Sequence, residues 1–144
     1  MFEMFALNAT EVRKDWGAFI DSVIREKPKI IKRSRDYIFT SSIDMTKELL
    51  KPYTFTALSY IEEDGSVTLS LNEFDLVVNA ENKDAALDML ARDLQEYSED
   101  FYKEFEYWHS APNRKPHLPY IMNVLLQNNL EGIKNIIKCQ AGES

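Results

Sequence analysis

Apolar residues in the first part of the chain recur at a helical spacing. Phe5-Ala6-Leu7 is a short apolar stretch that predicts an opening strand, and Asn8 after it can cap a helix. Glu11 stands three residues later and completes a capping-box pattern. One helix face is then marked by Val12, Trp16, Phe19, Ile20, Val23 and Ile24. Because Pro28 disfavours helical backbone before it, we expect one amphipathic helix that ends there.

A strand pattern follows this helix. Residues 29–33 and 37–40 are rich in Ile, Tyr and Phe, and the polar turn Ser34-Arg35-Asp36 lies between them. This arrangement predicts an antiparallel hairpin. Asp44 can then cap a short helix that ends at Leu50.

Pro52 marks a boundary to a second module with a different pattern. Residues 53–61 and 67–71 are strand-like, and the Asp64-Gly65 pair between them is a strong hairpin signal. Residues 74–79 predict a third strand in which alternate apolar side chains share one face. The module therefore begins as a three-stranded antiparallel sheet.

The most regular pattern in the chain predicts a long helix from Lys83 to His109, capped by Asn82. Its apolar stripe consists of Leu87, Leu90, Ala91, Leu94, Tyr97, Phe101, Phe105 and Trp108. At 1.5 Å per residue, a continuous helix of this extent would be about 40 Å long.

The last part of the chain opens with an irregular, proline-containing connection, Ala111–Pro119. Tyr120–Gln127 and Leu130–Lys138 then predict two short helices. The patterns together predict an α+β fold in three parts: a small α/β module at residues 1–51, a three-stranded antiparallel sheet packed on a long helix at residues 52–110, and a helical tail at residues 111–144.

The composition is that of a globular protein. The chain has 144 residues, of which 44% are hydrophobic, enough for one ordinary domain or two small ones. The single cysteine, Cys139, excludes an internal disulfide and a multi-thiolate metal site within one chain. No apolar run approaches the about 20 residues of a membrane helix, and the first residues do not resemble a signal peptide. We therefore expect a cytoplasmic protein with no membrane partner.

The net charge of −7 is distributed unevenly. Residues 1–51 carry ten Lys and Arg against eight Asp and Glu, which gives +2. Residues 52–110 carry three against fourteen, or −11, and residues 111–144 carry four against two, or +2. This asymmetry indicates modules with different partners, although acidic side chains that only solvate one long helix would explain it equally well.

Signs of catalysis are sparse. The four glycines are scattered and form no phosphate-binding loop. Cys139 has no obvious base beside it, and His109 and His117 are separated by prolines in a spacing that fits no metal signature. We expect ordinary surface histidines, no catalytic residue, no metal and no cofactor, and hence a protein that is not an enzyme.

Two short motifs in the first module point to a family. Thr10-Glu11-Val12-Arg13 opens the first predicted helix, and Arg33 ends the strand that follows. This pattern, over residues 5–50, resembles the N-terminal domain of Phd/YefM antitoxins, although Ser34-Arg35 replaces the Asn-Gly that is common in the family's turn. The resemblance implies a homodimer that binds operator DNA in its own promoter and holds a partner toxin inactive.

The cations of this module are compatible with that role. Arg13 and Lys14 lie in the first turns of a helix, where backbone N–H groups also favour phosphate. A dimer would double the cations and match a palindromic site. The candidate DNA-binding residues are Thr10, Arg13, Lys14, Lys32, Arg33 and Arg35. Without the resemblance, ordinary solvated Lys and Arg would be the simpler interpretation.

The second module also resembles an antitoxin family. Three strands and a polar turn lead into a helix with the Ala86-Leu87 pair, which looks like the β-β-β-α unit of HicB-type antitoxins. Only Asn72-Glu73 stands where that family has a Pro/Gly-rich segment, and a generic three-stranded sheet covered by a helix explains the pattern equally well. The resemblance implies that this module is the half that holds the toxin.

An acidic surface would steer association with a basic ribonuclease, while hydrophobic anchors would supply most of the affinity. The candidate toxin-binding residues are Tyr97, Phe101, Tyr102, Tyr107 and Trp108 on the long helix and Tyr120 in the tail. For any one of these side chains, packing in the core is the more frequent role.

The sequence therefore predicts a type II antitoxin that neutralises a protein toxin by direct binding and represses its own operon. A RelE-like ribonuclease is the expected toxin by analogy alone. One alternative is a stand-alone transcriptional regulator whose acidic module senses a ligand or a protein. Another is a small enzyme or ligand-binding domain, but no group of residues in the sequence supports it.

Overall fold

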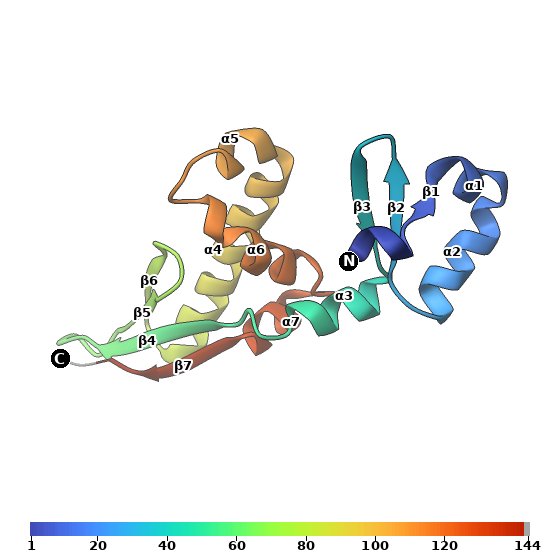
Figure 1. The fold of residues 1–144 in the computed structure, drawn as a ribbon. Coiled ribbons are helices and arrows are strands. Elements are labelled where there is room, and N and C mark those ends of the chain that lie inside the picture. Colours follow the sequence, from blue (N-terminus) through green and yellow to red (C-terminus); the bar gives the residue numbers. More distant parts are fainter. Residues whose placement is uncertain (143–144) are drawn as a thin grey trace. The chain divides into compact units, whose positions relative to one another are not determined.

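The chain folds into two compact units that divide between Leu49 and Leu50 (Figure 1). The structure is a computed structural model, and it describes residues 1–142. Within these residues the fold is α+β, with seven α-helices and two mixed sheets. We call residues 1–49 unit 1 and the residues from Leu50 onward unit 2, and we describe each unit by itself.

Unit 1 contains a three-stranded sheet and its covering helices. Its elements are the 3-10 helix η1 (Phe2–Phe5), β1 (Leu7–Asn8), α1 (Ala9–Lys14), α2 (Trp16–Arg25), β2 (Lys29–Arg33), β3 (Asp36–Thr40) and α3 (Ile43–Leu50). The strand order is β1-β2-β3; β1 is parallel to β2, and β3 is antiparallel to it. The predicted hairpin is confirmed, with Arg33 opposite Asp36 at its turn.

The first predicted helix is two helices. Asn8 caps α1 as expected, because its side chain accepts a hydrogen bond of 2.8 Å from the backbone N–H of Thr10. The chain then leaves the helical region at Asp15 (φ −141°, ψ 73°), whose carboxylate caps α2 by accepting from the N–H of Ala18 at 3.2 Å. The prediction of one helix was wrong because Asp15 acts as a second N-cap.

A second correction concerns α3. Its first turn is capped by Ser42, whose hydroxyl accepts a hydrogen bond of 3.1 Å from the N–H of Met45. Asp44, the predicted cap, lies inside the first turn. There its negative charge still suits the positive end of the helix dipole.

Unit 2 is a four-stranded sheet covered by a long helix. Its elements are β4 (Phe55–Ile61), β5 (Val67–Leu71), β6 (Val77–Ala80), α4 (Lys83–Lys103), α5 (Phe105–His109), the 3-10 helix η2 (Lys115–His117), α6 (Leu118–Leu125), α7 (Leu130–Asn135) and β7 (Ile137–Ala141). The order β6-β5-β4-β7 is antiparallel except for the parallel pair β4 and β7.

The fourth strand corrects the prediction of a three-stranded sheet with a wholly helical tail. The helix expected over Leu130–Lys138 ends at Asn135, and β7 then pairs with β4 so that Ile137 lies opposite Phe55. A short helix is only marginally stable by itself, whereas the unpaired edge of β4 offers a row of backbone hydrogen-bond partners, so tertiary structure decides this segment.

The core of unit 2 is formed by the sheet, α4 and the tail together. Alternate residues of β5 point inward as predicted, and Leu69 is fully buried. On α4, Leu90 and Leu94 are also fully buried, and in the tail Ile121 and Val124 are buried with them. Residues 111–142 thus contribute to the same core as the sheet and the long helix.

The long helix predicted from Lys83 to His109 is broken at Glu104 (φ −112°, ψ 52°), which separates α4 from α5. The rings of Tyr97 and Trp108 lie 5.6 Å apart, centre to centre. In a straight helix these residues would be about 16 Å apart along the axis. Burying the indole against Tyr97 therefore requires the break.

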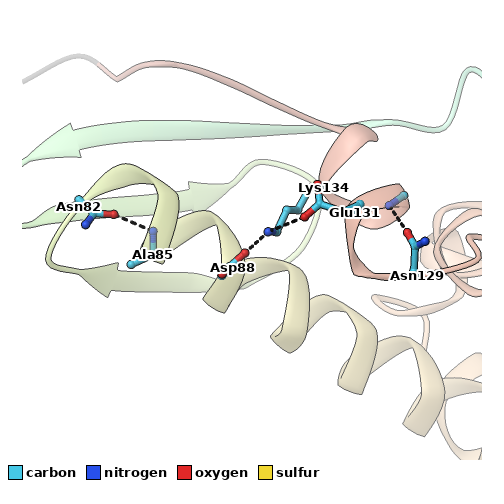
Figure 2. A network of polar contacts seen from close by, with 7 residues as sticks. Asn82, Ala85, Asp88, Asn129, Glu131 and Lys134 are labelled. Carbon is cyan, nitrogen blue, oxygen red and sulfur yellow. Dashed lines mark hydrogen bonds and ion pairs between the residues drawn. The ribbon is translucent and has the colours of Figure 1, made fainter.

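A polar network fastens α7 to the first turns of α4 (Figure 2). The side chains of Asn82 and Asn129 cap α4 and α7 by accepting backbone N–H hydrogen bonds of 2.8 and 2.9 Å. Lys134 pairs with Asp88 on α4 and, at 3.1 Å, with Glu131 on its own helix. The ammonium hydrogen bond lowers the pKa of Asp88, and its two carboxylate partners raise the pKa of Lys134. The network confirms the predicted cap at Asn82.

Candidate functional site

The predicted DNA-binding cations of unit 1 are all exposed. Arg13 and Lys14 lie on α1, Lys32 and Arg33 on β2, and Arg35 in the hairpin turn. One guanidinium nitrogen of Arg13 lies 3.4 Å from the Thr10 hydroxyl. Lys14 forms a surface ion pair of 3.1 Å with Glu11, and such exposed pairs are weak and exchange readily for other anions.

The structure brings Arg13 and Arg33 to the same apolar groove, which has a volume of about 340 Å³. The groove runs beside α1 and over β2 and β3, and its lining consists of Ala9, Val12, Arg13, Trp16, Ile31, Arg33, Asp36, Ile38 and Thr40. Two guanidinium groups from different elements thus border one surface, although they are twenty positions apart in the sequence.

Lys32 and Arg35 lie apart from this groove. Neighbouring residues of a strand point to opposite faces, so Lys32 projects away from Arg33. Its ammonium group lies 5.7 Å from the centre of the Tyr37 ring. Arg35 follows Ser34, which adopts the left-handed conformation (φ 56°) at the tip of the hairpin. The six predicted residues therefore do not form one continuous cluster.

Unit 2 contains an aromatic cluster where α4, α5 and η2 meet. The hydroxyl of Tyr97 lies 2.8 Å from Nδ1 of His117, and the His117 ring stacks on Phe74 with 4.1 Å between ring centres. The guanidinium carbon of Arg114 lies 5.6 Å from the centre of the Tyr97 ring and 5.8 Å from that of Trp108. Cation–π contacts of this kind stabilise the packing of α5.

Partial burial lowers the pKa of His117 below its ordinary value of 6.5, and the nearby charge of Arg114 lowers it further. Asp75 opposes these effects. The imidazole is therefore mainly neutral at pH 7. The prediction of two ordinary surface histidines was wrong for His117.

The predicted toxin-binding aromatics separate into buried and exposed residues. Phe101 is fully buried, and Tyr97 and Trp108 are half-buried in the aromatic cluster. Tyr120 is half-buried against Phe55, with 5.5 Å between ring centres. Only Tyr102 and Tyr107, which are 60% and 70% exposed, present most of their surface to solvent.

The break at Glu104 creates a feature that the sequence pattern did not reveal. Phe105, which the helical stripe placed in the core, is 39% exposed on α5. It contributes to an open hollow of about 650 Å³ whose lining consists of Phe105, Glu106, Tyr107, His109 and Ser110. Figure 1 shows α5 at the C-terminal end of α4.

Within residues 1–142, no three or more His, Cys, Asp or Glu side chains gather in a way that could hold a metal ion. In the same residues, no helix combines the length and the apolar character needed to cross a membrane.

A family model for PHD-like proteins, described as the antitoxin of a toxin–antitoxin, RelE/RelB, TA system, matches residues 1–139. The chain belongs to this antitoxin family. The match runs through both units, so both are parts of the antitoxin. An antitoxin implies a cognate toxin as its partner. This match does not decide whether the first module is of the Phd/YefM type or the second of the HicB type, so both resemblances stay predictions.

A solved structure supports the same assignment. The antitoxin is similar to a crystal structure from Syntrophomonas wolfei subsp. wolfei, which is named as the antitoxin part of a proposed toxin/antitoxin system. The two chains share 38% sequence identity with a TM-score of 0.91, over 95% of this chain and 99% of the other. No curated protein matches the antitoxin.

Proposed function

We propose that the antitoxin divides two tasks between its units: unit 2 neutralises a basic toxin by direct binding, and unit 1 binds operator DNA as a homodimer. The uneven charge carries this proposal, because unit 1 (residues 1–49) has a net charge of +1 and unit 2 (residues 50–144) a net charge of −8. An acidic surface attracts a basic protein and repels DNA, so one surface is unsuited to both partners.

The homodimer is supported by the small core of unit 1. Its buried apolar cluster contains only Val12, Phe19, Val23 and Ile31. Outside the groove of Arg13 and Arg33, ten large apolar side chains of the unit are exposed, namely Met1, Phe2, Met4, Phe5, Leu7, Ile24, Phe39, Ile43, Met45 and Leu49. Exposed apolar surface on this scale is typical of an interface, and a domain of this size needs additional burial to be stable.

DNA binding is supported by Arg13 and Arg33 at the shared groove. Guanidinium groups bind phosphate, or the edge of guanine, through paired hydrogen bonds. A homodimer presents the pair twice, related by a two-fold axis, and so fits a palindromic operator. With about six to ten phosphate contacts per dimer, affinity would fall by roughly 10³ to 10⁵ between 50 and 200 mM salt.

A RelE-like ribonuclease is the toxin that this charge pattern fits best. Enzymes that hold RNA present cationic surfaces, and an acidic unit 2 would cover such a surface while aromatic anchors supply most of the affinity. Among the aromatic candidates, Tyr102 and Tyr107 are the most accessible.

Co-expression tests the neutralising role. The protein encoded by the neighbouring reading frame should arrest growth alone, and the antitoxin should restore growth and co-purify with it. Absence of both rescue and co-purification contradicts the proposal.

Promoter binding tests the second role. The Arg13→Ala/Arg33→Ala variant should bind the promoter at least about tenfold more weakly while it stays folded. A matched control, Arg25→Ala/Lys27→Ala, removes the same charge from the C-terminal end of α2 and the loop after it, and should retain binding within about threefold. Unchanged binding of the first variant at several salt concentrations contradicts the assignment.

A further inference from the structure

We infer that the hollow on α5 is the docking site for an arginine-bearing segment of the toxin. This inference rests on the proposed function, in which unit 2 holds a basic protein. It adds where on unit 2 the toxin binds and which chemical group of the toxin is recognised there. We call the residues that line the hollow, Phe105, Glu106, Tyr107, His109 and Ser110, the α5 patch.

Exposed apolar residues of unit 2 are concentrated at this place. Within the described part of the unit, the large exposed apolar side chains are Ile61, Val77, Met89, Tyr102, Phe105 and Tyr107. Half of them therefore lie in the six residues from Tyr102 to Tyr107. Single exposed apolar residues are ordinary on protein surfaces, whereas aromatic side chains gathered around a hollow are typical of binding sites.

The α5 patch stands on a packed support. Trp108, on the same short helix, stacks on the fully buried Phe101 with 16° between ring planes and 6.4 Å between centres. Phe105 contacts Phe101 at its edge, with 6.0 Å between centres, and His109 stacks on Phe105 at 4.7 Å. Because these contacts hold α5 in place, a partner would lose little entropy in ordering the patch.

One carboxylate, that of Glu106, lines the hollow, and further acidic residues stand close to it in the sequence. The stretch from Glu99 to Glu106 contains four acidic residues, Glu99, Asp100, Glu104 and Glu106, and the single cation Lys103. Within residues 1–142, none of the four forms a salt bridge. Glu104 and Glu106 are both exposed and flank the first turn of α5.

An exposed aromatic ring beside the Glu106 carboxylate, which forms no salt bridge within residues 1–142, favours a guanidinium group. Arginine stacks on aromatic faces and forms paired hydrogen bonds with a carboxylate. Lysine is a compact point charge and matches neither geometry as well. A purely apolar partner would have to desolvate Glu106, and a nucleic acid would meet like charge. A basic protein surface that presents arginine satisfies both parts of the α5 patch.

The inference is tested with the full-length antitoxin and the purified product of the neighbouring reading frame. Tyr107→Ala removes an exposed ring, and Glu106→Lys reverses one charge of the patch. Each variant should weaken binding at least about tenfold, and Glu106→Lys should also reduce the dependence of affinity on salt. The controls Met89→Ala and Glu63→Lys make comparable changes elsewhere on unit 2 and should stay within about twofold of the unaltered chain.

The possible outcomes separate the inference from the proposed function. If the unaltered antitoxin neither binds the product nor rescues growth, the proposed function fails and the inference fails with it. If the unaltered chain binds and both patch variants bind within about twofold of it, only the α5 patch is contradicted. If Glu63→Lys weakens binding as much as Glu106→Lys does, the charge effect is general and the inference is also overturned.

Discussion

The hydroxyl of Tyr97 on α4 lies 2.8 Å from Nδ1 of His117 on η2. This hydrogen bond joins the long helix to the tail of the antitoxin, beside the stack of His117 on Phe74 and the contact of Arg114 with the Tyr97 ring. The group of side chains that fastens the tail also supports α5, because Arg114 reaches Trp108 as well. The stability of this cluster therefore bears on the surface proposed for the toxin.

Lowering the pH should destabilise the antitoxin through His117. Its pKa is below 6.5 in the folded chain because of burial, and near 6.5 in the unfolded chain. Between these values the unfolded state binds more protons, so stability present above pH 6.5 is lost as the pH falls toward the folded pKa. Urea unfolding of the unaltered chain from about pH 7.5 to 5.5 should show this decline, and His117→Gln should show a smaller one.

His109, the other histidine, makes no hydrogen bond with Tyr97 and serves as the reference for this experiment. A His109→Gln variant should keep the pH dependence of the unaltered chain. If His117→Gln keeps it too, the destabilisation at low pH has another source.

Two neighbouring aromatics should respond very differently to truncation. Phe101 is fully buried, so Phe101→Ala should lower the free energy of unfolding by about 3 to 5 kcal/mol. Tyr102 is 60% exposed, and Tyr102→Ala should change it by no more than about 0.5 kcal/mol. Denaturant unfolding measures both, and equal losses would contradict the packing of α4.

The hairpin turn of unit 1 should reject a branched side chain. Ser34 has φ 56°, a region that Asn tolerates and a β-branched residue does not. Ser34→Val should cost about 1 to 2 kcal/mol, and Ser34→Asn should be close to neutral. A Ser34→Val variant with unaltered thermal stability would show that the turn is not strained.

The cap of α7 offers a test of the polar network in Figure 2. Asn129 accepts a hydrogen bond of 2.9 Å from the N–H of Gly132, so Asn129→Ala should cost about 1 kcal/mol. Asn128, one residue earlier, is the matched control and should have little effect when it is replaced by Ala. Equal thermal stability of the two variants would speak against the cap.

Features set by local chemistry were predictable from the sequence. Asn8 and Asn82 cap the helices assigned to them, and Gly65 takes a positive φ of 86° in the predicted Asp-Gly turn. In β5, the alternation of apolar and polar residues matches the alternation of buried and half-buried positions. Each of these signals depends on a few neighbouring residues.

The differences arise where distant contacts compete with local pattern. Helical spacing extends past Glu104, but the contact of Trp108 with Tyr97 exists only if the helix breaks. The helix predicted from Leu130 extends to Lys138, yet Ile137 and the residues after it pair with the edge of β4 as a strand. Local propensity carries no information about either partner.

The candidate surfaces show the same limit. That Lys32 and Arg33 lie on opposite faces follows from the alternation of a strand, and could have been foreseen. The approach of Arg13 and Arg33 to one groove depends on how α1 packs on the sheet. The exposure of Phe105 depends on the helix break, which is why the helical stripe placed this ring in the core.

The division of the two tasks is tested most directly by titrating two full-length variants, Arg13→Ala/Arg33→Ala and Tyr107→Ala, against both the promoter and the purified neighbouring gene product. We expect the first variant to lose at least about tenfold in promoter affinity and to keep its toxin affinity within about twofold, and we expect the second variant to show the reverse. Equal losses of both affinities in either folded variant would contradict the assignment of one task to each unit.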